Sequence, residues 1–134
     1  MLDPHGALIY TMVIVSAAES NLSDGELQMI GDMIGQLPVF RDFDRQALPQ
    51  LLNDCAESLG RDDGLEATLK KISTALPAKL HETAYAIACD LVAADGEASQ
   101  EELRLLELIR HRLKVDRLSA AAIERGARAR FQTL

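Results

Sequence analysis

The sequence of 134 residues contains no tryptophan, and aromatic side chains make up only 4% of it. Its apolar content is carried mainly by alanine, leucine and isoleucine, a composition that favours helices over strands. No segment alternates apolar and polar residues as a half-buried strand does. The composition and pattern therefore predict an all-α protein.

Basic residues are also scarce. The chain has 14 Lys and Arg against 21 Asp and Glu, which gives a formal net charge of -7. A nucleic-acid partner needs a basic stripe to displace counterions from phosphates, and the sequence has none. The excess of acidic residues predicts that the protein binds cations or basic protein partners instead.

The sequence has little cysteine and no apolar run of membrane-spanning length. Cys55 and Cys89 stand apart from any CxxC spacing and within apolar helical patterns, so we expect buried thiols in a reducing compartment. The apolar stretch 7–18 is about half the length of a bilayer span, has no basic leader and is followed by Glu19. It predicts a core helix, and the chain is expected in the cytoplasm.

Motifs of catalysis are missing as well. His5, His81 and His111 lie in separate segments without an HExxH spacing, and no glycine-rich phosphate loop occurs. Each histidine is expected on the surface, because no charged partner is recognisable beside it. These absences predict a protein that is not an enzyme.

Apolar residues at helical spacing, with caps and breakers between them, predict about seven helices in a single domain of residues 1–134. Pro49 is expected to delay the start of the third helix. The helices are expected over residues 4–18, 23–37, 44–59, 62–76, 77–95, 99–113 and 116–131. Two of the inner faces are expected to consist of Leu27, Ile30, Ile34 and Leu37, and of Leu103, Leu106, Ile109 and Leu113.

An internal repeat is the most informative feature. Residues 17–27 align with residues 93–103 and share both alanines, a serine, a glutamate and a leucine. Each copy contains a capping box, Ser23 with Glu26 and Ser99 with Glu102, at the start of a helix. We therefore expect two helix–acidic turn–helix units, residues 4–37 and 77–113, packed about a pseudo-twofold axis in a compact bundle.

The second turn, Ala94-Asp95-Gly96-Glu97 followed by Ser99 and Glu102, resembles the acidic turn of the TerB family. That family comprises tellurite-resistance proteins and related domains attached to J-domain co-chaperones. The resemblance implies an all-helical, non-enzymatic module of stress-response or envelope-associated complexes, with acidic clusters that bind divalent cations. The first turn departs from the family pattern at Glu19-Ser20-Asn21.

Carboxylates cluster in the second turn, and Ca²⁺ and Mg²⁺ prefer such oxygen ligands. The spacing is shorter than the roughly 12-residue loop of an EF-hand. The predicted metal ligands are Asp95, Glu97, Glu101 and Glu102, joined by Glu19 and Glu26 from the first turn. A purely structural interpretation stays open, in which Asp95 ends a helix, Gly96 adopts a left-handed turn and the glutamates favour a helix N-terminus.

The primary hypothesis is a cytoplasmic interaction module, also suited to the membrane periphery, whose acidic turns bind a divalent cation or a basic protein. The alternatives are a small metal-dependent enzyme using Asp95 and Glu102, and an adaptor domain for a chaperone complex. Basic residues cluster only near the end of the chain. They are expected to form an exposed helix face, or alternatively to contact an acidic partner or lipid headgroups. They are Arg117, Arg125, Arg128 and Arg130.

Overall fold

The protein is all-helical, as predicted. The computed structural model describes residues 1–18 and 22–134, and these residues form seven α-helices, three short 3-10 turns and no strand. The α-helices are α1 (Pro4–Ser16), α2 (Asp24–Gln36), α3 (Leu48–Leu59), α4 (Gly64–Ala75), α5 (His81–Ala94), α6 (Gln100–Arg112) and α7 (Arg117–Arg130). The 3-10 turns are η1 (Pro38–Phe40), η2 (Arg45–Ala47) and η3 (Ala78–Leu80).

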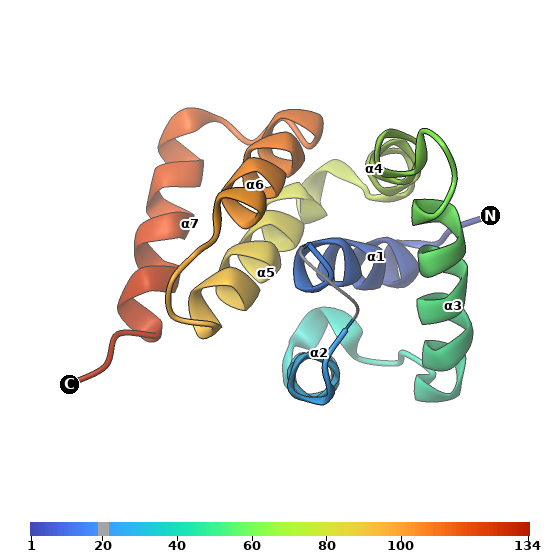
Figure 1. Ribbon diagram of the computed structural model, residues 1–134, viewed down its shortest axis with the longest axis horizontal. Coiled ribbons are helices and arrows are strands. Elements are labelled where there is room, and N and C mark those ends of the chain that lie inside the picture. Colours follow the sequence, from blue (N-terminus) through green and yellow to red (C-terminus); the bar gives the residue numbers. More distant parts are fainter. Residues whose placement is uncertain (19–21) are drawn as a thin grey trace.

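Helix α1 forms the centre of the core. Every residue from Gly6 to Val15 is buried, as expected for a helix that is apolar on all sides. It contacts α3 and α4 on one side and α5 and α6 on the other, and α2 also packs on it (Figure 1). The remaining helices therefore turn their apolar faces toward α1 or α5.

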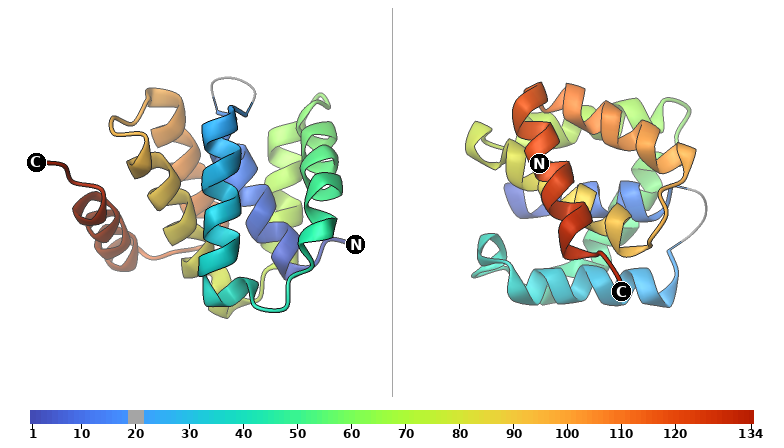
Figure 2. Two further views of the ribbon diagram at one scale, coloured as in Figure 1. Left: turned by 90° about the horizontal axis from the view of Figure 1, so that it is seen from below. Right: turned by 90° about the vertical axis from the view of Figure 1, so that its left-hand side faces the viewer.

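Helix α7 lies at the edge of the bundle, far from α3 and α4 (Figure 2). It packs along α5, which also contacts α6, but α6 and α7 have little contact with each other. Helices α6 and α7 thus stand side by side on α5 without closing the space between them. No helix in the described ranges is long and apolar enough to cross a membrane.

Local signals placed most helix ends correctly. The Asp3 carboxylate accepts a hydrogen bond from the Gly6 backbone N–H at 2.8 Å, with Pro4 in the first turn of α1. Pro49 delays the third helix as expected, because α3 begins at Leu48, after the 3-10 turn η2. The Asp116 carboxylate caps α7 through the Ser119 backbone N–H at 2.9 Å.

The predicted inner faces were wrong at their first positions. Leu27 is 38% exposed and Leu103 is 48% exposed, whereas Ile30, Leu106 and Ile109 are buried. The two leucines lie in the first turn of their helices, at the margin of the core. For Leu103 the reason is tertiary, because α7 does not pack against α6 and leaves this side chain uncovered.

Two histidines also differ from the expectation of surface positions. The Nε2 of His5 lies 2.8 Å from the Val39 carbonyl oxygen, and the ring stacks on Phe40. His81 is half-buried, with its ring nitrogens 2.9 and 3.2 Å from the carbonyl oxygens of Leu113 and Leu76. Both histidines therefore join segments of the fold, and only His111 is exposed.

Candidate functional site

The two capping boxes form with the same geometry. In the first, the Ser23 backbone N–H donates to Glu26 Oε1 at 2.9 Å, and the Glu26 N–H donates to Ser23 Oγ at 3.1 Å. In the second, Ser99 and Glu102 exchange hydrogen bonds of the same lengths. Each glutamate is thus held back against the turn that precedes its helix. The local repeat is real, while the pseudo-twofold packing of the two units stays a prediction.

The second turn begins where α5 ends. Asp95 is the C-cap residue of α5, and Gly96 follows with a φ of 93°. The left-handed conformation predicted for Gly96 is confirmed, and it suits glycine because a side chain would be strained there. This reversal directs the chain from α5 into α6 and brings Glu97 back beside the end of α5.

Acidic residues from both turns line a hollow of about 170 Å³, which we call the acidic hollow. Its wall on the α1 side is made by Val15, Ser16 and Ala18. The other residues that line it are Glu26, Asp95, Glu97, Ser99 and Glu102. Four of the six predicted metal ligands therefore lie around one space, although Glu26 is distant in sequence from the others.

The other two predicted ligands have different positions. Glu101 is exposed in the first turn of α6 and does not line the hollow. Glu19 lies outside the described residues. Within residues 1–18 and 22–134, no three His, Cys, Asp or Glu side chains form a group that could hold a metal ion. The carboxylates thus share a hollow without being arranged as a preformed coordination sphere, and the ligand set stays a prediction.

Charge in the hollow is concentrated and negative. Glu102 is only 8% exposed, and its carboxylate is stabilised by the Ser99 N–H. Among the described residues, Glu26, Glu97 and Glu102 form no ion pair with a basic side chain. A hollow lined by several carboxylates attracts cations, because their negative potentials add where protein walls exclude water.

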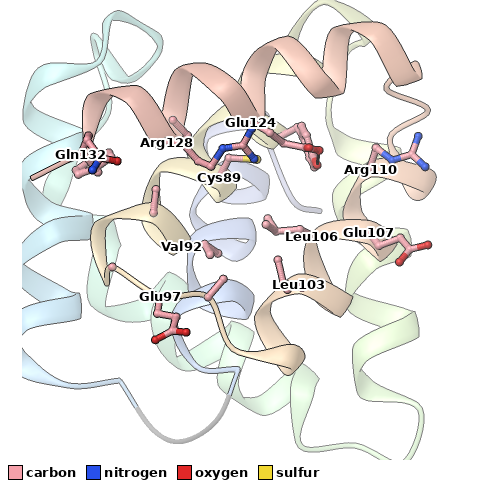
Figure 3. A pocket seen from close by; sticks show the side chains of 16 residues that line it. Cys89, Val92, Glu97, Leu103, Leu106, Glu107, Arg110, Glu124, Arg128 and Gln132 are labelled. Carbon is pink, nitrogen blue, oxygen red and sulfur yellow. Dashed lines mark hydrogen bonds between the residues drawn. The ribbon is translucent and has the colours of Figure 1, made fainter.

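A larger space, about 590 Å³, lies between α5, α6 and α7, and we call it the helical groove (Figure 3). Cys89 and Val92 of α5 form its floor, and Leu103 and Leu106 of α6 form one wall. The sequence analysis missed this groove. The core-like spacing of Leu103 predicted a closed interface between helices, and nothing in the sequence showed that α6 and α7 would stay apart.

The groove contains a polar pair formed by buried Tyr85 and partly exposed Glu124. The Tyr85 hydroxyl donates to Glu124 at 2.5 Å, which ties α5 to α7. Burial, followed by this hydrogen bond, raises the pKa of Tyr85 well above its usual value. Burial also raises the pKa of Cys89 to about 12. The Cys89 thiol is therefore protonated at neutral pH and is not activated as a nucleophile.

Both cysteines are free and buried, as predicted, and this gives a test of thiol reactivity. Burial raises the pKa of Cys55 to about 12 as well.

Near pH 8 the native thiols should hold on the order of a thousandfold less thiolate than a free cysteine, so iodoacetamide should label them slowly. Mass spectrometry of digested samples would measure each rate. We expect Cys89, which lines the groove, to react faster than Cys55, and both to react rapidly in guanidinium. Rapid labelling of the native chain would contradict this.

These features define an all-helical module with two capped turns joined at an acidic hollow. The family model described as "Tellurite resistance protein TerB" matches residues 5–125, so the chain belongs to the TerB family. No curated protein and no solved structure matches the chain.

Proposed function

We propose that this chain is a non-enzymatic stress-response interaction module of the TerB family whose acidic hollow binds a divalent cation. The observation that carries the proposal is the convergence of Glu26 with Asp95, Glu97 and Glu102 around one hollow. Ca²⁺ and Mg²⁺ take oxygen ligands, and Mg²⁺ keeps several waters when only one or two carboxylates bind it directly. A hollow of about 170 Å³ has room for a cation that keeps part of its hydration shell.

The positions of the carboxylates on their helices support a cation. Asp95 caps the C-terminal end of α5, where the helix macrodipole disfavours negative charge. Glu26 and Glu102 each use one carboxylate oxygen, Oε1, in a capping box. Within residues 1–18 and 22–134 their Oε2 atoms accept no hydrogen bond, so a cation or its bound water can reach them. A bound cation would therefore lower the repulsion between these groups while leaving both caps intact.

Isothermal titration with Mg²⁺ and Ca²⁺ tests the proposal. The native chain should release or absorb heat in a saturable way at millimolar metal or below. Glu102→Gln should weaken binding by at least about tenfold, the size of effect seen when groups that orient metal ligands are removed. A glutamine is accepted in a capping box, so this change removes charge while the cap of α6 is kept.

Glu101→Gln is the matched control, because Glu101 lies next to Glu102 and carries the same charge but does not line the hollow. It should leave the affinity nearly unchanged. No heat from the native chain at millimolar metal would refute the cation site. Equal weakening by both variants would also count against it, since that result reflects net charge alone.

A basic protein partner is the second candidate, favoured by the exposure of Leu27 and Leu103 directly after the two capping glutamates. Acidic side chains with uncovered leucines suit a partner that offers both basic and apolar groups. The same pair of variants tests this candidate by partner recovery in pull-down experiments. Loss of a partner with Glu102→Gln but not with Glu101→Gln would support it, and unchanged recovery would count against it.

A further inference from the structure

The helical groove is a second concave site, separate from the acidic hollow, with which it shares only Glu97. Its floor is apolar and buried, since Cys89 is 4% exposed and Val92 is 5% exposed. Leu103 and Phe131, at 48% and 36% exposed, stand uncovered on its two walls. The groove thus presents apolar surface that neither α6 nor α7 covers.

Arg128, an exposed residue of α7, directs its side chain over this apolar floor. Figure 3 shows Arg128 reaching from α7 across the groove toward Cys89, whereas Glu97 and Glu107 point away from its centre. Within the part of the chain that the structure describes, the Arg128 guanidinium has no hydrogen bond or ion pair.

The neighbouring charges are already engaged. Arg130, two residues along α7, donates to Asp90 at 2.5 Å. Arg110 donates to the Val115 carbonyl at 3.3 Å. The Glu124 carboxylate accepts from the Tyr85 hydroxyl. Arg110 keeps its charge, since a carbonyl is neutral, but among the described residues Arg128 is the groove arginine without a protein partner, and its five N–H donors suit a carboxylate.

The size of the groove suits a small molecule. About 590 Å³ falls within the range of roughly 300–1,000 Å³ that is typical of small-molecule sites. An apolar floor with an arginine directed over it fits a ligand that has an apolar body and one anionic group.

We propose that the groove binds a free amphipathic carboxylate of the fatty-acid class, with its alkyl chain on Val92, Leu103 and Leu106 and its carboxylate on Arg128. The apolar contacts remove alkyl surface from water. The charge-assisted hydrogen bonds to Arg128 select the acid over a neutral chain of the same length. This ligand site is independent of the cation site, so either can fail alone.

Decanoate, kept below its micelle concentration, is the probe, and decanol is its uncharged counterpart. Isothermal titration should show one decanoate bound per chain, roughly tenfold tighter than decanol. Arg128→Gln should abolish this preference and leave decanol binding unchanged. Leu103→Asp, at an exposed position, should weaken both ligands, and circular dichroism would verify that both variants remain helical.

Arg125→Gln is the matched control, because Arg125 lies on the same helix and is exposed, as Arg128 is, but does not line the groove. It should preserve the preference for decanoate. The proposal is overturned if decanoate does not bind, or if Arg125→Gln and Arg128→Gln reduce its binding equally. Binding to phosphatidylglycerol vesicles without binding of free decanoate would also overturn it, since the groove would then face a membrane.

Cys89 provides an independent readout, because it forms part of the floor while Cys55 lies outside the groove. Saturating decanoate should slow iodoacetamide labelling of Cys89 several-fold and leave Cys55 unaffected. Equal slowing of both thiols would indicate general stabilisation of the fold and would contradict a ligand in the groove.

Discussion

Replacing Leu8 by alanine should lower the free energy of unfolding by about 3–5 kcal/mol. Leu8 is 0% exposed in the middle of α1, the helix that α3, α4, α5 and α6 all contact. Removing its side chain loses burial and leaves a cavity inside the central helix's packing, which the close-packed surroundings fill only in part.

Urea denaturation followed by far-ultraviolet circular dichroism would measure this loss. Leu118→Ala is the control, because Leu118 is 82% exposed and the change should alter stability by less than about 0.5 kcal/mol. A loss below about 1 kcal/mol for Leu8→Ala would contradict the central position assigned to α1.

Replacing Gly64 by alanine should destabilise the protein by about 2–3 kcal/mol and lower its melting temperature by roughly 10 °C. The Cβ of an alanine would lie 2.6 Å from the Ser58 carbonyl oxygen, and nearer still to that of Leu59. These are backbone atoms at the end of α3, which cannot move aside as a flexible side chain can. The chain would have to shift α4 relative to α3.

Gly60→Ala provides the comparison, because its nearest neighbour would be the Ala56 carbonyl oxygen at 3.5 Å, an ordinary contact. Gly60 also has a φ of -77°, which alanine adopts readily. This variant should be neutral or more stable by a few tenths of a kcal/mol. Differential scanning calorimetry of both variants would measure the difference, and equal melting temperatures would refute the close approach at Gly64.

The two proposed sites share α5, α6 and Glu97 but differ in the other helices that they need. The acidic hollow needs the ends of α1 and α5 together with the starts of α2 and α6, since these supply its lining. The helical groove needs only α5, α6 and α7. A substitution that loosens α7 should therefore affect the groove before the hollow.

The elements of the fold could be predicted from the sequence because their causes are local. A capping box joins residues three positions apart, so Ser23 with Glu26 and Ser99 with Glu102 could be recognised without a structure. The same holds for the turn at Gly96, whose left-handed conformation needs no distant partner. The buried α1 followed from an apolar run too short to span a membrane.

Which helix faces are covered, and where the groove lies, depends on how the helices pack against one another. Spacing along a helix shows which residues share a face but not whether a neighbouring helix covers that face, and so Leu103 was wrongly expected in the core. For the same reason the sequence did not reveal the groove or the direction of the Arg128 side chain over its floor.

The acidic cluster shows most clearly which features the sequence predicts and which depend on tertiary packing. The sequence identified its residues by charge, but contiguity made Glu101 look equivalent to Glu102, although a helix turns adjacent residues to different faces. Only tertiary packing could bring Glu26 to Asp95, Glu97 and Glu102, because their approach depends on how α1 and α5 lie against each other. The sequence by itself thus determined the helices, their caps and the acidic character of the turns. The tertiary structure decided which carboxylates share a hollow and where the groove lies, since both depend on distances between segments far apart in the chain.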